Sequence, residues 1–163
     1  VVEQAMRAAG IRPDEPVLVV VHSQGGLVAA RVVADPAIQS HYDVAAVLTA
    51  GSPIGGIDLP DGVQVMSLEH SQDAVPALDG RPNPDTPFRT TVERDLSRSA
   101  DPRDRAAASP FGAHPLSVYE RTARGLEGSD DPSVQGFTAA LDRVLAGAVS
   151  ARTTIFQGVR TAR

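Results

Sequence analysis

The stretch that decides the fold is VLVVVHSQGGLVAA, residues 17–30, in which an apolar run stops at a serine and a helix-forming run follows. The five residues VLVVV are apolar and mostly β-branched, which is typical of a strand buried on both faces of a parallel sheet. The residues from Gly25 onward predict a helix. Ser23 therefore lies at a tight turn from strand to helix, where its hydroxyl is expected to stand at the carboxyl end of the sheet.

This turn has two interpretations. In a nucleophile elbow, Gly25 and Gly26 leave room beside Ser23, and the backbone N–H of Gln24 points at a developing oxyanion. In the other interpretation, Ser23 is an ordinary N-cap of the helix. The strand before it and the double glycine favour the elbow. One residue departs from the full G-x-S-x-G motif, because Val21 stands where the first glycine is expected and crowds the turn.

The rest of the chain predicts an α/β fold with one domain over residues 1–163. Alternation of strands and helices favours a parallel sheet with right-handed crossovers. The predicted helices are residues 1–11, 25–36, 116–126 and 132–147, and the further strands are residues 44–50 and 63–70.

Two regions carry weaker signals. Residues 79–113 are rich in Pro, Asp and Arg, which predicts an irregular loop or a cap over a site, with a disordered connection as the alternative. Within it, the alternation in PFRTTVERDL (87–96) is compatible with one more strand. The tail SARTTIFQGVR (150–160) is a further candidate strand.

A serine nucleophile needs a base, and the base needs a third group that orients it. Asp73 follows the strand at 63–70 and is the candidate acid, with an Asx turn in a loop as the alternative role. His114 is the histidine that comes after it in the chain, and it is the candidate base. His22 lies within the turn itself and His41 precedes the acid, so His70, three residues before Asp73, is the remaining rival.

Composition limits the classes of function. The net charge of −5 gives no electrostatic reason to expect nucleic acid as a partner. There is no cysteine, so the sequence indicates neither disulfides nor thiolate chemistry. No apolar run is long enough for a transmembrane segment. The sequence does not indicate a compartment.

Four segments together resemble lipase-like serine α/β-hydrolases: HSQGG (22–26), GSPIGG (51–56), QDAVPAL (72–78) and HPLSVY (114–119). The resemblance implies a three-layer fold with a mostly parallel sheet. It implies Ser23 as nucleophile, Asp73 as acid, His114 as base and the Gln24 amide as an oxyanion donor. Ser52 is interpreted as structural, because a proline follows it where an elbow needs an N–H.

The chemistry implied is cleavage of a small-molecule or lipid carboxylic ester through an acyl-enzyme, without a metal or an organic cofactor. An acyltransferase would use the same residues, with an alcohol in place of water. The resemblance begins only at the elbow, so the chain is expected to be the carboxyl-terminal part of such a domain. The loop that normally supplies a second oxyanion donor is not found.

A partial domain has a second consequence. The strand at 17–21 would lack one neighbour and expose unpaired backbone groups. A missing amino-terminal region or a dimer partner is then expected at this sheet edge. The alternative to an enzyme is a non-catalytic hydrolase fragment or an interaction module, whose triad residues need not meet.

Overall fold

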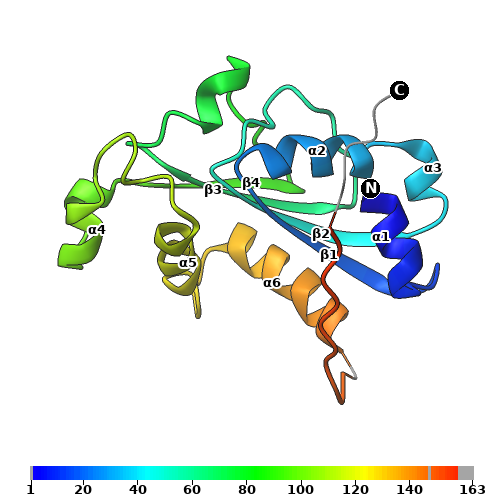
Figure 1. Cartoon of the computed structure of the whole chain (residues 1–163). Coiled ribbons are helices and arrows are strands. Elements are labelled where there is room, and N and C mark those ends of the chain that lie inside the picture. Colours follow the sequence, from blue (N-terminus) through cyan, green and yellow to red (C-terminus); the bar gives the residue numbers. More distant parts are fainter. Residues whose placement is uncertain (1, 147, 158–163) are drawn as a thin grey trace.

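The computed structural model describes residues 2–146 and 148–157. Four strands form its sheet: β1 (Pro16–His22), β2 (Asp43–Ala50), β3 (Gln64–His70) and β4 (Arg89–Arg94). They are all parallel and lie in the order β1-β2-β3-β4. The predicted α/β class is confirmed, and the carboxyl ends of all four strands meet at one end of the sheet (Figure 1).

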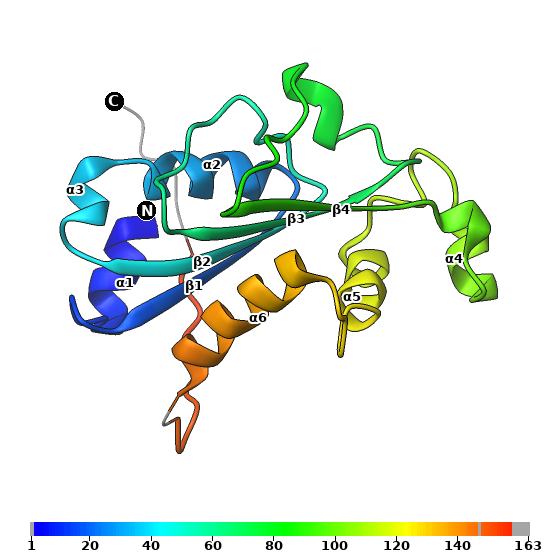
Figure 2. The same ribbon diagram turned by 180° about the vertical axis from the view of Figure 1, so that it is seen from behind.

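Helices cover both faces of this sheet, as Figures 1 and 2 show from opposite sides. One face carries α1 (Val2–Ala9), α2 (Gln24–Val33) and α3 (Pro36–Gln39), and the other carries α5 (Leu116–Arg124) and α6 (Pro132–Leu145). A short helix, α4 (Pro102–Ala106), follows β4, and single 3-10 turns occur at η1 (Pro76–Asp79) and η2 (Leu96–Arg98).

Two apolar clusters hold the layers together. On the α2 face, Ala30 and Val33 pack with Val47 and Val65 of the central strands. On the other face, a cluster joins α5 and α6 to the sheet through Ala46, Ala50, Met66, Leu68, Tyr119, Val134, Phe137 and Ala140. The central strands are apolar on both faces because each face meets a helix layer.

The predicted helix over 25–36, with Asp35-Pro36 as its stop, corresponds to α2, and a second short helix, α3, begins at this stop. Asp35 accepts a hydrogen bond from the backbone N–H of Ala37, and Pro36 occupies the first position of α3. Proline suits that position because its missing N–H would have no partner there. The Asp-Pro pair therefore ends one helix and begins the next.

Residues 79–113 are more ordered than the predicted irregular loop or cap. The segment adds β4 to the sheet, as the alternation in residues 87–96 indicated, and then forms η2 and α4. Leu96 and Ala113 are fully buried and pack against Val118 of α5. The composition of this segment predicted an irregular loop, but its Asp-Pro pair begins the short helix α4 instead of interrupting regular structure.

The predicted strand at 150–160 is wrong over the residues described. Residues 150–157 have no regular structure and are exposed, and residues 158–160 lie outside the described part. A β-branched stretch such as residues 153–155 does not make a strand without a neighbour to pair with. No helix in the part of the chain that the structure describes has the length and apolar character needed to span a membrane.

Candidate active site

Ser23 has a backbone conformation that an ordinary helix cap does not need. Its φ is 57° and its ψ is −134°, and it is the one non-glycine residue with positive φ among those described. Such a conformation costs on the order of 1–3 kcal/mol and persists where the surroundings impose it. Its backbone N–H donates to Ala50 O over 2.9 Å. Ser23 occupies the N-cap position of α2, but its side chain makes no capping hydrogen bond.

The two glycines after the serine differ in what they must avoid. A Cβ on Gly26 would lie 2.3 Å from both Cβ and Oγ of Ser52, whereas one on Gly25 would meet only Val21 Cβ at 3.8 Å. Ser52 is 1% exposed, and its hydroxyl donates to Ala50 O over 3.3 Å. Gly26 is therefore the residue that lets α2 approach the loop after β2. Val21 leaves enough room beside Gly25 that even an added Cβ would meet it only at an ordinary contact distance.

The structure brings the three predicted triad residues together from three separate segments. Nδ1 of His114 lies 2.7 Å from Oδ2 of Asp73, and Nε2 of His114 lies 3.0 Å from Oγ of Ser23. The Asp73 side chain is fully buried, and that of His114 is 25% exposed. With a proton on Nδ1 facing the carboxylate, Nε2 is left as an acceptor for the serine proton.

The Asp73 carboxylate serves two purposes at once. Oδ1 accepts the backbone N–H of Val75 over 3.0 Å, which is the Asx turn considered as its alternative role. Oδ2 accepts the Tyr119 hydroxyl over 2.8 Å in addition to His114. Burial, and then the hydrogen bond to Asp73 and its charge, raise the pKa of Tyr119, so this hydroxyl is a donor. The carboxylate is thus fixed on both oxygens.

Two of the other histidines, His22 and His70, are engaged elsewhere. His70 is buried, and its Nδ1 and Nε2 lie 2.8 Å from Ala113 O and from Thr122 Oγ1. Both ring nitrogens are used, so the rival base has no nitrogen left for a serine. His22 Nε2 is engaged as well, since it lies 2.8 Å from the carbonyl oxygen of His114.

A buried ion-pair cluster lies behind the site and was not foreseen from the sequence. Asp104, whose side chain is 1% exposed, binds Arg94 through Oδ2 and Arg121 through Oδ1. Burial alone would raise the pKa of Asp104, but hydrogen bonds from Arg121 and Ser99 and the charge of Arg94 outweigh it and lower that pKa. Arg94 also donates to Thr122 Oγ1 over 3.1 Å. No local pattern joins these residues, because they meet only through the packing of α4, α5 and β4.

One of the predicted oxyanion donors can be placed in the structure. Gln24 is the first residue of α2, so its backbone N–H has no acceptor within the helix and is free to meet an anion. No group of three or more His, Asp or Glu side chains suited to a metal ion occurs in the described ranges.

No family model, curated protein or solved structure matches the chain. What the chain does is therefore to be judged from the chemistry of its own residues.

Proposed function

We propose that this protein is a serine hydrolase that cleaves a carboxylic ester through an acyl-enzyme, on an α/β-hydrolase-like fold. The observation that carries the proposal is the continuous hydrogen-bond chain from Ser23 Oγ through His114 to Asp73 Oδ2. Nucleophile, base and orienting acid stand in the mutual geometry that acyl transfer requires.

Each residue then has a defined part in the reaction. His114 Nε2 takes the hydroxyl proton as Ser23 Oγ attacks the ester carbonyl carbon, and the Gln24 N–H donates to the resulting oxyanion. As the carbon–oxygen bond to the leaving group breaks, His114 gives its proton to the departing alcohol. Water then attacks the acyl-serine, loses a proton to the same nitrogen, and releases the acid and the free serine. Asp73 holds the imidazole in the required tautomer throughout.

The backbone of Ser23 is the feature that favours an enzyme over a non-catalytic interaction module. A module gains nothing from a residue held at positive φ without a capping bond. A nucleophile gains an exposed hydroxyl at the end of a strand, which offsets the strain.

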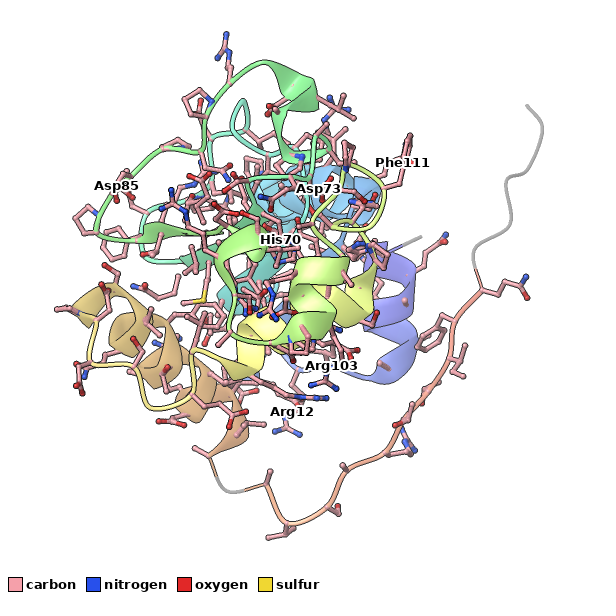
Figure 3. The ribbon with its side chains drawn as sticks, turned by 90° about the vertical axis from the view of Figure 1, so that its left-hand side faces the viewer. Arg12, His70, Asp73, Asp85, Arg103 and Phe111 are labelled. Atoms are coloured by element: carbon pink, nitrogen blue, oxygen red, sulfur yellow. The ribbon has the colours of Figure 1, made fainter. Side chains whose placement is uncertain are left out.

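Exposed apolar side chains beside the base favour an apolar ester. Phe111 is 92% exposed and Leu116 is 47% exposed, and both flank His114 in the chain. Phe111 projects outward from its loop, whereas His70 and Asp73 lie within the body of the molecule (Figure 3). Large exposed apolar residues close to a reactive group are suited to contact an acyl chain.

A fluorophosphonate probe tests the proposal on the full chain, since it reacts with an activated serine without needing the natural ester. We expect the wild-type protein to be labelled and Ser23→Ala to remain unlabelled. Ser52→Ala is the matched control, because Ser52 also follows a strand, and it should be labelled like the wild type. Undiminished labelling of Ser23→Ala would overturn the assignment of the nucleophile.

A further inference from the structure

We propose that His22 and His70 are positioning residues that hold the backbone of the catalytic histidine by donating to two successive carbonyl oxygens. This inference rests on the proposed function, since it concerns the base of the same reaction. The acceptors are the carbonyls of Ala113 and His114, which lie on either side of the His114 Cα.

The first of these bonds ties the base to the elbow strand. His22 Nε2 lies 2.8 Å from His114 O, and a carbonyl only accepts, so Nε2 carries the proton. The two imidazole rings lie 4.7 Å apart with a tilt of 34°. His22 is the last residue of β1 and directly precedes Ser23, so the nucleophile and the residue that holds the carbonyl of its base are neighbours at one strand end.

The second bond ties the base to the strand that leads to the acid. His70 Nδ1 lies 2.8 Å from Ala113 O, which by the same reasoning makes Nδ1 the donor. Nε2 then accepts from the Thr122 hydroxyl over 2.8 Å. The His70 ring stacks on Tyr119 with centroids 3.9 Å apart and planes 14° apart, and Tyr119 donates to Asp73. One ring thus contacts the supports of both base and acid.

The base needs such support because of where it lies. His114 comes from the turn that precedes α5 rather than from a helix or a strand. A misplacement of about 1 Å at a reacting group costs on the order of 100-fold in rate. Donors from the carboxyl ends of β1 and β3 fix this turn to the same sheet that carries the serine and the acid.

The positioning role requires one particular ring nitrogen of each histidine to donate, whereas a merely structural role does not. Variants that keep or remove that donor therefore distinguish the two roles. The amide nitrogen of glutamine can replace Nε2 of histidine, and that of asparagine can replace Nδ1. His22→Gln should therefore preserve the bond to His114 O, and His22→Asn should lose it. For His70 the order is reversed, because His70→Asn retains the donor to Ala113 O and His70→Gln does not.

The test compares these four full-chain variants by the rate of fluorophosphonate labelling and by the low-field NMR signal of the His114 Nδ1 proton. Denaturant unfolding is recorded alongside. We expect His22→Asn to be labelled about 10- to 100-fold more slowly than His22→Gln, and His70→Gln more slowly than His70→Asn by a similar factor. The two slow variants should also lose or shift the NMR signal. His22→Gln and His70→Asn should stay near the wild type.

The outcomes separate this inference from the function on which it rests. Wild-type protein that is not labelled would contradict the proposed function. Labelled wild type, with equal rates and unshifted signals within each Asn/Gln pair, would overturn the positioning role. If a His70 variant does not fold, the His22 pair decides, since His22 is only partly buried at the edge strand.

Discussion

The two edge strands of the sheet are built from opposite chemistry. β4 reads RTTVER, and its three charged side chains all have partners. Arg89 donates to the carbonyls of Ile54 and Ile57, Glu93 accepts the Ser71 hydroxyl, and Arg94 binds Asp104. β1 reads PVLVVVH, with no formally charged residue, and Val20 is 60% exposed. Natural edges are protected by charges, and interior strands are apolar. β4 therefore has the composition of an edge, whereas β1 has that of an interior strand.

The burial of the strands agrees with this difference. β3 pairs on both sides and has five buried residues among its seven, whereas no residue of β1 is fully buried. Within residues 2–146 and 148–157, β2 is the one strand that pairs with β1. Asp73 thus follows a strand that pairs on both sides, whereas Ser23 follows a strand that has one neighbour within the described residues.

A substitution of Asp73, which follows the doubly paired strand β3, should have the largest effect. Asp73→Asn keeps the shape of the side chain but presents an amide to His114, which leaves the imidazole in the wrong tautomer. We expect kcat for a p-nitrophenyl ester to fall about 10⁴-fold with folding preserved. Tyr119→Phe removes only one donor to the same oxygen and should cost far less. Equal losses in the two variants, measured by steady-state kinetics, would contradict the role of Asp73.

Whether the edge strand β1 pairs with another chain is tested by placing a charged residue on each edge strand in turn. If β1 pairs with another chain in solution, the wild-type protein should grow in size with concentration, as measured by light scattering. Val20→Lys should suppress this growth because an edge lysine opposes strand pairing. Thr91→Lys on β4 is the matched control and should leave the size unchanged. If the wild-type protein stays a cooperatively unfolding monomer at every concentration, the expected pairing of β1 with another strand is wrong.

The packing of the elbow predicts a difference between its two glycines. Gly26→Ala places a methyl group against buried Ser52, and we expect it to lower the free energy of unfolding by about 1–3 kcal/mol. Gly25→Ala meets only an ordinary contact with Val21 and should be close to neutral. Urea unfolding of both variants measures this, and a reversed order would contradict the described contact between α2 and the loop after β2.

The smallest expected effect is the pH dependence of stability. Burial lowers the pKa of His70 below its ordinary value of 6.5, and the charge of Arg94 lowers it further. The Ala113 carbonyl, Asp73 and Asp104 raise this pKa, but their effects are outweighed. Below pH 6.5, His70 is protonated in the unfolded chain but stays neutral in the folded protein until the pH reaches its lower folded pKa. The free energy of unfolding therefore falls as the pH drops from about 6.5 toward the folded pKa. His70→Asn should flatten this fall in urea unfolding measured from about pH 7.5 to 5.5. An unchanged slope would contradict it.

The parts of the site that could be predicted are those set by chain order and strand ends. Ser23 and Asp73 each follow the end of a strand, and parallel strands bring such positions to one edge. His114 lies between α4 and α5 and was indicated by its place in the chain after the acid. Their convergence was predictable for that reason, although their catalytic role stays a prediction. β4 was only weakly indicated, because a polar edge strand lacks the apolar run that marks its neighbours.

The supports of the site could not be predicted, because they depend on tertiary packing. From the sequence, His22 is predicted only as part of the turn, and His70 only as a rival base. Nothing local in the sequence directs their rings to the carbonyls on either side of His114. The ion pairs of Asp104 likewise join residues that no periodicity connects.

The measurement that tests the central claim most directly is intact-protein mass spectrometry after mixing the full chain with a p-nitrophenyl ester. The account predicts one added acyl group, mapped by peptide digestion to Ser23, and no such adduct in Ser23→Ala. Ester cleavage without an adduct, and at the same rate in Ser23→Ala, would contradict it.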